Sequence, residues 1–477
     1  MNTTIRKTVL ALSCLAFATS CGTAAPKENS AVQVFKPSSS FKLPSFDEKS
    51  LSNGLTVLYI KDESLPYISY SLLIKGGSST DPADASGLTS FVADILEQGT
   101  AKRNATQIAD ELASIGAEFS ASVSSDYSLF GTGALSSDAE PLLNLFSEII
   151  TQPSFAAEEV DRSTKRTIAQ LKKRVDSPEA FIDLAWEDSL FGAGHPYSKP
   201  VSGTVASVEK LRRKNIIQHY LKYFRPNNSI LAVVGKVTPE IRQKVETAFG
   251  SWEPKKVAAV TLPDVPKVEG TQIVLVNKPG LVQSQIRIGN PGIRRNNPDF
   301  LTLRVANTIL GGAFSSRLVN RVRRDLGLTY SISSGFDARQ GQGAFEISTF
   351  TKNQTLGKTI EETMSVVRTF TDKGVSEAEV EQAKGYLAGM FPTSIETAEK
   401  LAFNLMVLRV YGISDNYLRD YLSDLSDVSA ADVNKAIKKY IDPANVKMVV
   451  YSSAEVAPQL KAIKGANLTI KKASEYQ

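Results

Sequence analysis

Histidine and cysteine, the side chains that most often hold transition metals, are scarce in this chain of 477 residues. The only histidines are His195 and His219, so no pair of imidazoles one helical turn apart exists. Both cysteines, Cys14 and Cys21, lie near the N-terminus, which leaves the rest of the chain without a thiolate nucleophile, a Cys-x-x-Cys pair or a disulfide. Gly-x-Ser-x-Gly is also absent, which argues against a serine hydrolase. Histidine-rich metal sites are therefore excluded unless a partner supplies ligands.

The overall composition indicates a globular protein with more than one core. Hydrophobic residues make up 42% of the chain and charged residues 22%, and the length fits two to four domains. The mean hydropathy of -0.12 excludes a multispan membrane protein. The net charge is only +5, and basic residues alternate with acidic ones, so nucleic-acid binding is not expected.

The N-terminus has the pattern of a secretory signal. Arg6 and Lys7 precede an apolar run over residues 8–18, which is too short to span a membrane, so residues 1–20 are predicted to be removed. The sequence Ala-Thr-Ser-Cys-Gly that ends at Gly22 resembles a bacterial lipobox. Cys21 is then the lipidated first residue of the mature chain. The alternative is an ordinary cleaved signal with an incidental cysteine.

Two further features of this region complete the prediction of an envelope protein. Gly22 after the cysteine resembles lipoproteins of the outer membrane, which puts the body at the periplasmic face. Residues 21–46 contain several prolines and small polar residues without a sustained period, so they are expected to form a flexible tether between lipid and body.

The body of the chain repeats one plan. The apolar pattern of residues 88–96 returns at 301–310, the glycine-led alternating stretch from Gly116 returns from Gly327, and each half ends with an amphipathic helix and a proline-led strand. We therefore predict an N-terminal domain over 47–252, a proline-containing linker over 253–270 and a homologous C-terminal domain over 271–477.

Runs of strand-like segments joined by tight turns, each followed by helices, favour the α+β class. We expect two tandem homologous domains, each with a largely antiparallel sheet and helices on one face, together forming one half of a clamshell. No Gly-x-Gly-x-x-Gly follows a strand and opens a helix, so a doubly wound nucleotide-binding sheet is disfavoured.

Over residues 47–455 the chain resembles the pitrilysin/insulinase family of zinc peptidases, in particular its shorter bacterial members and the mitochondrial processing peptidase subunits. The motifs that carry the resemblance are Asn53-Gly54-Leu55, Gly76-Gly77-Ser78, Ser86-Gly87-Leu88, Gly99-Thr100, His195-Pro196-Tyr197, Arg225-Pro226-Asn227-Asn228, the run from Gly311 to Leu318 and Gly327-Leu328-Thr329-Tyr330-Ser331. Their order and spacing are specific, although each motif alone is weak.

The resemblance implies a zinc motif, HxxEH, that this sequence lacks. The motif's two histidines and its glutamate base correspond to Ser90, Asp94 and Ala93, and the glutamate ligand that follows about 76 residues later corresponds to Gln170. The helix itself keeps an apolar stripe formed by Leu88, Phe91, Val92, Ile95 and Leu96. Loss of the metal site is therefore favoured over misalignment, and Asp94 alone is expected to be a solvated helix-face residue.

Arg323 and Tyr330 have the spacing of a pair that the family uses to reach substrate from its second domain. The resemblance implies that a guanidinium and a phenol orient the peptide and stabilise an oxyanion. Taken alone, Arg323 would be a surface arginine and Tyr330 a packing residue. His195 is expected to cap or pack a turn, and His219 to be a structural or surface residue.

These features lead to one functional hypothesis and two alternatives. The chain is predicted to be a non-catalytic, metal-free subunit that pairs with a homologous HxxEH-bearing subunit, which holds the zinc, on peptide or unfolded polypeptide substrates. One alternative is a proteolytically inactive scaffold or peptide-binding module of the same fold. The other is an autonomous metallopeptidase with unusual ligands.

Overall fold

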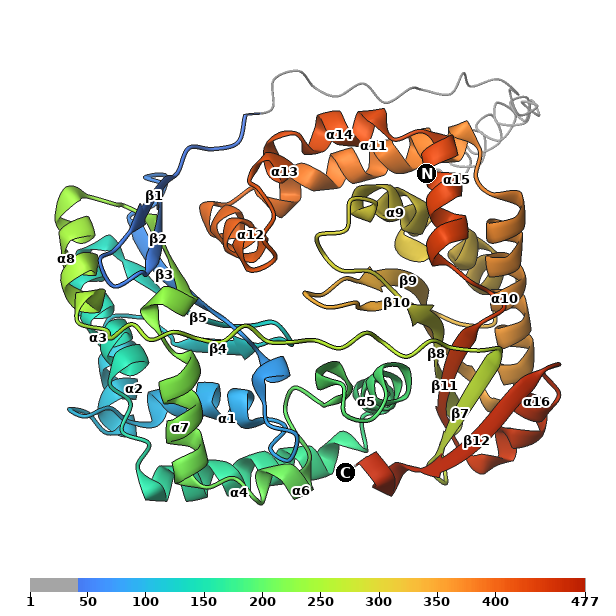
Figure 1. Cartoon of the computed structure of the whole chain (residues 1–477), viewed down its shortest axis with the longest axis horizontal. Coiled ribbons are helices and arrows are strands. Elements are labelled where there is room, and N and C mark those ends of the chain that lie inside the picture. Colours follow the sequence, from blue (N-terminus) through green and yellow to red (C-terminus); the bar gives the residue numbers. More distant parts are fainter. Residues whose placement is uncertain (1–41, 477) are drawn as a thin grey trace, which may run out of the picture.

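The computed structural model describes residues 42–476, which form two six-stranded sheets (Figure 1). The predicted signal, Cys21 and most of the predicted tether lie outside the described residues. The first sheet, here called the N sheet, has the order β1-β2-β6-β3-β5-β4. Its strands are β1 (Asp47–Ser50), β2 (Thr56–Lys61), β3 (Tyr67–Lys75), β4 (Ser120–Val123), β5 (Tyr127–Leu135) and β6 (Ser229–Gly235).

The second sheet, here called the C sheet, has the order β12-β7-β11-β8-β10-β9. Its strands are β7 (Thr271–Asn277), β8 (Gln283–Pro291), β9 (Ile332–Asp337), β10 (Ala344–Lys352), β11 (Val446–Ser452) and β12 (Ala466–Lys472). Five strands of each sheet correspond one to one. In both sheets one pair of these strands is parallel, β2–β6 and β7–β11, and the others are antiparallel. The prediction of a duplicated α+β fold with largely antiparallel sheets is confirmed.

The sixth strand of each sheet comes from a different end of the chain. In the N sheet β1 pairs antiparallel with β2, whereas in the C sheet β12 pairs parallel with β7. Residues 253–269 between the two halves form no helix or strand, and Figure 1 shows them crossing from the N sheet to the C sheet.

Helices follow the strands in both halves. The N half contains α1 (Leu88–Ile95), α2 (Ala105–Ser114), α3 (Ala139–Thr151), α4 (Ala157–Arg174), α5 (Pro178–Phe191), α6 (Val205–Val208), α7 (Arg213–Tyr223) and α8 (Pro239–Gly250). The C half contains α9 (Phe300–Asn307), α10 (Leu356–Lys373), α11 (Glu377–Ser394), α12 (Ala398–Val410), α13 (Asn416–Arg419), α14 (Tyr421–Asp427), α15 (Ala430–Tyr440) and α16 (Ala457–Lys461). None of the helices in residues 42–476 is long and apolar enough to cross a membrane.

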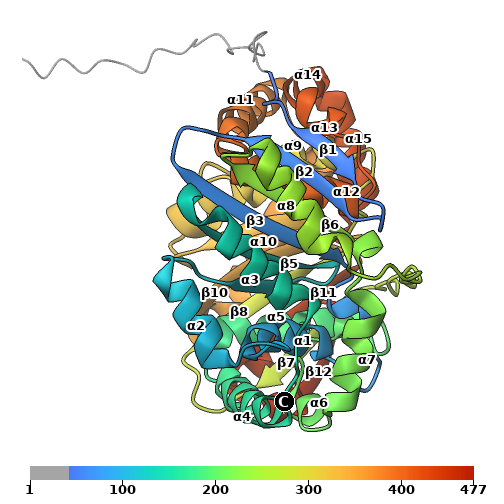
Figure 2. The same cartoon turned by 90° about the vertical axis from the view of Figure 1, so that its left-hand side faces the viewer.

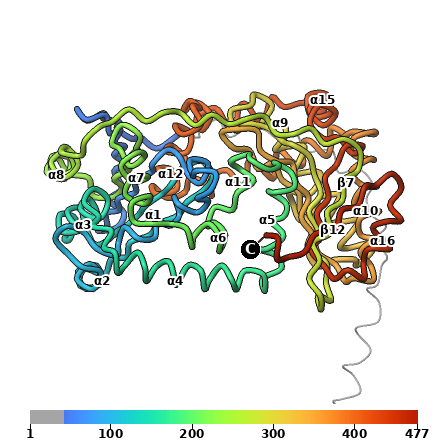
Figure 3. Tube along the Cα trace, turned by 60° about the horizontal axis from the view of Figure 1, so that its bottom comes forward, coloured from blue at the N-terminus to red at the C-terminus, as the bar shows by residue number. Residues whose placement is uncertain are grey.

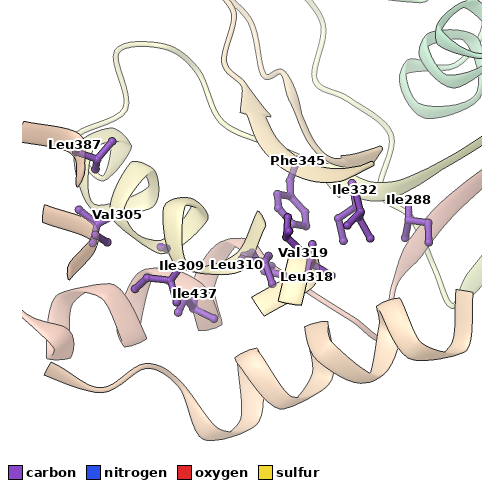
Figure 4. Packing of buried hydrophobic residues seen from close by; sticks show 14 of the residues in the cluster. Ile288, Val305, Ile309, Leu310, Leu318, Val319, Ile332, Phe345, Leu387 and Ile437 are labelled. Carbon is purple, nitrogen blue, oxygen red and sulfur yellow. The ribbon is translucent and has the colours of Figure 1, made fainter. Parts of the chain in front are cut away.

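Because side chains alternate between the two faces of a strand, each face of a sheet packs against its own set of helices. In β3 the side chains of Ile68, Tyr70, Leu72 and Ile74 join the core made with the helices of the N half, and Figure 2 shows α3 and α8 over this face. The C half builds its core in the same way. Figure 4 shows Val305 and Ile309 near Leu387 and Ile437, while Leu318 and Val319 lie close to Ile332 and Phe345.

The second face of each sheet is covered by a helix from the other half. α5 packs on β8 and β11 of the C sheet, and α12 packs on β6, β2 and β3 of the N sheet (Figure 1). Phe181 of α5 lies with its ring centroid 4.6 Å from that of Tyr451 in β11. The C-terminal end also returns to α5, as Figure 3 shows, where Tyr476 contacts Phe181. Sequence periodicity does not reveal this exchange, because it marks a buried face but not its partner.

Replacing Phe181 by alanine tests whether the exchanged helix stabilises the whole body. Phe181 is fully buried against the opposite half, so Phe181→Ala should lower the free energy of unfolding by about 3–5 kcal/mol in urea titrations. The control Leu65→Ala alters an exposed residue and should change it by less than about 0.5 kcal/mol. Equal stability of both variants would contradict the proposed importance of this contact.

Candidate functional site

Three of the four altered zinc-motif positions meet in one hollow between α1 and α4. This α1–α4 pocket has a volume of about 370 Å³, and its lining includes Ala93 and Asp94 from α1, Gln170 from α4 and Ala121 from β4. Glu97, Phe119 and Arg166 complete the lining. The structure therefore brings three of the four sequence-predicted positions together across a separation of more than 70 residues.

Local interactions fix α1 in place without any metal. Gly87 precedes the helix with a φ of 86°, a left-handed conformation that glycine adopts without strain. Leu88, Phe91, Val92 and Ile95 are buried, as the apolar stripe predicts. The helix therefore gains its stability from core packing.

The charges of the α1–α4 pocket come from three side chains. Burial raises the pKa of Asp94 and of Glu97, while the positive charge of Arg166 lowers both. Asp94 further raises the pKa of Glu97, because two carboxylates on neighbouring turns repel each other. The cation in this pocket is thus a guanidinium of the chain itself.

The residues of this pocket do not fit a zinc ion. A catalytic zinc site needs three protein ligands, usually imidazole or carboxylate, with one open position. Here the pocket offers an alanine, an amide and two carboxylates beside a permanent cation. Within residues 42–476, no three His, Cys, Asp or Glu side chains gather as a set that could hold a metal ion.

Ser90, the fourth predicted position, is not part of the pocket lining. Its hydroxyl donates a hydrogen bond to the carbonyl of Val201, 2.8 Å away. The loop that carries Val201 lies close to the start of α1, since a Cβ on Gly87 would meet the Cα of Gly203 at 2.7 Å. Arg174 holds the same loop through the Ser202 hydroxyl at 2.7 Å. Ser90 therefore anchors a neighbouring loop.

A buried polar chain supports the N-terminus of α1, and the sequence analysis did not identify it. Asp81 accepts hydrogen bonds from the backbone N–H of Gly87 and Thr89, both at 2.8 Å, and from the Thr89 hydroxyl at 2.6 Å. That hydroxyl lies 2.9 Å from Nε2 of His219. Because the single hydroxyl hydrogen goes to Asp81, Nε2 of His219 is the donor in the second contact. An aspartate shortly before Ser-Gly-Leu was the available signal for this helix cap.

Both histidines have structural roles. Nδ1 of His195 accepts a hydrogen bond from the backbone N–H of Tyr197, and Nε2 lies 3.1 Å from the carbonyl of Pro263. Burial lowers the pKa of His195. Burial also lowers the pKa of His219 to about 4, with help from the nearby charge of Lys222. Both imidazoles are neutral at pH 7. The ring of His195 contacts Tyr197 and Pro263, and that of His219 contacts Thr89 at the start of α1.

Arg323 and Tyr330 lie in the C half, outside the α1–α4 pocket. Arg323 is on the π-helical turn η7 (Val319–Asp325), and its guanidinium stacks over the ring of Phe314 at 4.7 Å. Gly327 follows the turn with a φ of 59°, a left-handed conformation that is common where a helix ends. Tyr330 lies two residues before β9 rather than in the strand, because Thr329 and Ser331 close a bend by mutual hydrogen bonds.

The consequence of this bend is an exposed aromatic surface. The side chain of Tyr330 is 80% exposed and that of Phe314 is 68% exposed. Within the described part of the chain, neither Arg323 nor Tyr330 forms a hydrogen bond or an ion pair. Both side chains are available to a ligand or to another chain.

Family comparisons agree with the duplicated fold. Residues 56–192 match the insulinase domain of peptidase family M16, and residues 210–387 match the domain described as the peptidase M16 inactive domain. The uncharacterized zinc protease YmxG of Bacillus subtilis is 24% identical over 74% of this chain and 85% of its own length. An uncharacterized zinc protease of Rickettsia bellii is 24% identical over 85% of this chain and 97% of its own length.

Two solved structures share the whole architecture. The structure titled peptidase M16 inactive domain, from Pseudomonas fluorescens, superposes with a TM-score of 0.80 at 24% identity, covering 86% of this chain and 98% of that one. A protease from Helicobacter pylori gives a TM-score of 0.78 at 20% identity, covering 86% of this chain and 100% of that one. Together with the two family matches, these structures show that the chain has the M16 fold.

His219 generates a pH-dependent prediction for the support of α1. Its folded pKa of about 4 lies below the value of about 6.5 in unfolded chains, so the unfolded state binds the extra proton between these values. The stabilisation is complete above about pH 6.5 and is lost as the pH falls toward 4. Compared with His219→Gln, the native chain should lose about 3 kcal/mol more unfolding free energy between pH 7 and 4.

Urea unfolding of both proteins at successive pH values measures this difference. Burial raises the pKa of Asp81 to about 6, which acts in the opposite direction, but this contribution is present in both proteins and largely cancels. Parallel stability curves for the two proteins would show that His219 is not held neutral by the fold.

Proposed function

Because the chain belongs to the M16 (insulinase/pitrilysin) peptidase family and its α1–α4 pocket lacks the ligands of the HxxEH motif, we propose that it is the metal-free subunit of a heterodimeric zinc peptidase. The observation that carries the proposal is the pocket itself. Ala93, Asp94 and Gln170 meet where the ligands would be, with Arg166 as the local cation. The zinc then belongs to a homologous partner subunit that keeps the motif.

The C half supplies the contribution of this chain to the shared site. Arg323 and Tyr330 bind and orient the peptide, and stabilise negative charge on its carbonyl oxygen, in the site of the partner. The exposure of Tyr330 and the absence of an ion pair or side-chain hydrogen bond to either residue within the described part of the chain support this role. The exposed Tyr330 and the Arg323 guanidinium stacked on Phe314 resemble the aromatic and arginine anchors that dominate protein interfaces.

The N half offers a place for an extended peptide. β4 is the outer strand of the N sheet, so one edge of its backbone is unpaired within that sheet. Phe119 and Ala121, before and within this strand, line the α1–α4 pocket. A peptide that adds to this edge as a further strand would place side chains beside the pocket. Unfolded segments suit such an edge because their backbone groups are free to pair.

The predicted location follows from the N-terminus and remains part of the proposal. Lipidation at Cys21 would tether the chain to the membrane and leave its body at the periplasmic face. Substrates would then be peptides or unfolded polypeptides of the cell envelope.

A scaffold or peptide-binding module of the same fold is the second candidate, and the changes at the three ligand positions and the base position favour it equally. The two candidates differ in their use of Arg323 and Tyr330. A scaffold needs the fold and its surfaces, whereas a subunit of an active peptidase also needs these two side chains at the reacting peptide.

Alanine substitution of the pair separates the two candidates. The chain is co-expressed with its HxxEH-bearing homologue, and peptidase activity and complex formation are both measured. Arg323→Ala with Tyr330→Ala should lower kcat/KM about 100-fold while the complex still forms. The control Arg324→Ala removes a neighbouring arginine that bonds only to Asn320 and should retain activity. If the double variant assembles and keeps full activity, the scaffold hypothesis is favoured. If the native chain does not assemble with the homologue, the subunit hypothesis is refuted.

Metal analysis tests the alternative that the chain is an autonomous metallopeptidase with unusual ligands. The purified chain alone should contain no stoichiometric zinc, because its pocket holds no imidazole and keeps Arg166 beside its carboxylates. The heterodimer should contain one zinc per complex, as measured by plasma mass spectrometry after dialysis. One tightly held zinc in the isolated chain would overturn the assignment of the metal to the partner.

A further inference from the structure

The C half contains a second hollow, far from the α1–α4 pocket, that neither the fold comparison nor the proposed function uses. It lies between α10 and α16 over the ends of β7 and β11, and its volume is about 570 Å³. Figure 1 shows α16 on the opposite side of the molecule from α1. This α10–α16 cavity is lined by Ile360, Met364, Met448, Ile463, Arg368 and Lys464, among others.

The duplication explains why the space is open. In the N half the equivalent helix is α8, which has 12 residues and packs against α3. Phe249 of α8 is fully buried, with its ring 6.5 Å from Phe146 of α3 and 6.2 Å from Trp252. In the C half α16 has only 5 residues. It brings no aromatic residue over α10, so the volume that aromatic side chains fill in one half stays open in the other.

The floor of the cavity is apolar and adaptable. Ile360, Met364 and Met448 line it and are almost fully buried, and Ile463 is half-buried within its lining. Only 5 methionines occur in the whole chain, and two of them lie here. Methionine side chains are flexible and polarizable, so they accommodate apolar ligands of varied shape. The volume lies in the usual range of roughly 300–1,000 Å³ for small-molecule sites.

The charged side chains of the cavity are predominantly cationic. Arg368 and Lys464 are exposed, and neither side chain forms an ion pair or hydrogen bond with another described residue. Glu361 adds one negative charge to the lining and is also unpaired there. Gln459 is already engaged, since it bonds the backbone N–H of Gly357 and the carbonyl of Asn353. The lining therefore offers two free cations above an apolar floor.

We propose that the α10–α16 cavity binds a single-chain amphiphile whose head is an oxyanion, either a carboxylate or a phosphate. The acyl chain lies on Ile360, Met364 and Met448, and Arg368 holds the head with the paired N–H groups of its guanidinium. Lys464 adds a second positive charge, which disfavours a cationic head. The site is independent of peptide hydrolysis and of the partner subunit.

Calorimetric titration of the full chain, at ligand concentrations below micelle formation, tests the ligand class. Dodecanoate and dodecyl phosphate should bind with 1:1 stoichiometry, and the tighter of the two identifies the head group. Dodecanol and dodecyltrimethylammonium should bind at least about tenfold more weakly. Absence of saturable binding, or equal binding of the cationic amphiphile, would overturn the proposal.

Two variants with matched controls locate the site. Ile463→Trp fills the hollow and Arg368→Glu reverses the charge beside it, so each should weaken dodecanoate binding at least about tenfold. Ile470→Trp on β12 and Lys358→Glu on α10 make the same changes at exposed residues that do not line the cavity, and they should bind as the native chain does. Unfolding curves verify that all four variants fold. Unchanged binding in Arg368→Glu would refute the site.

Discussion

The exchange of α5 and α12 between the two halves is the constraint on which the rest of the structure depends. Each helix covers the sheet of the opposite half, so neither half can complete its core alone. Buried polar contacts strengthen this junction. Asp126, in the turn before β5, accepts hydrogen bonds from the hydroxyls of Tyr197 and of Tyr411, which follows α12. Because a buried carboxylate that loses its donors is costly, the two halves are held in one relative orientation.

A rigid body of this kind explains how the ligand positions could change without loss of the fold. α1 is held from below by its apolar stripe and at its N-terminus by Asp81, and neither contact involves the α1–α4 pocket. Removing zinc ligands from such a helix leaves its packing intact. It also removes the unfavourable electrostatic free energy of holding several ligands together without a metal. The positive charge of Arg166 balances the carboxylates of Asp94 and Glu97.

Sequence reasoning identified what is encoded by short-range patterns. The repeated order of strands and helices and the stripe on α1 follow from spacing along the chain, whereas Ala93, Asp94 and Gln170 were identified through the resemblance to the zinc peptidases. The exchanged helices do not, because periodicity marks a buried face without naming its partner. Arg166 lies one helical turn before Gln170, so an i, i+4 reading of that helix would have found it. The link from Asp81 through Thr89 to His219 joins residues 138 positions apart, and no local pattern encodes it.

The two halves of the duplicated fold contain pockets that arise in different ways. In the N half Ala93 stands at the base position and Gln170 at a ligand position, and the pocket has a guanidinium beside an unpaired strand edge. In the C half a shortened helix leaves an apolar hollow with free cations. Exposed Phe314 and Tyr330 add a third surface that internal packing does not explain. Solvent-facing aromatic and cationic side chains of this kind are typical of surfaces that bind a ligand or another chain.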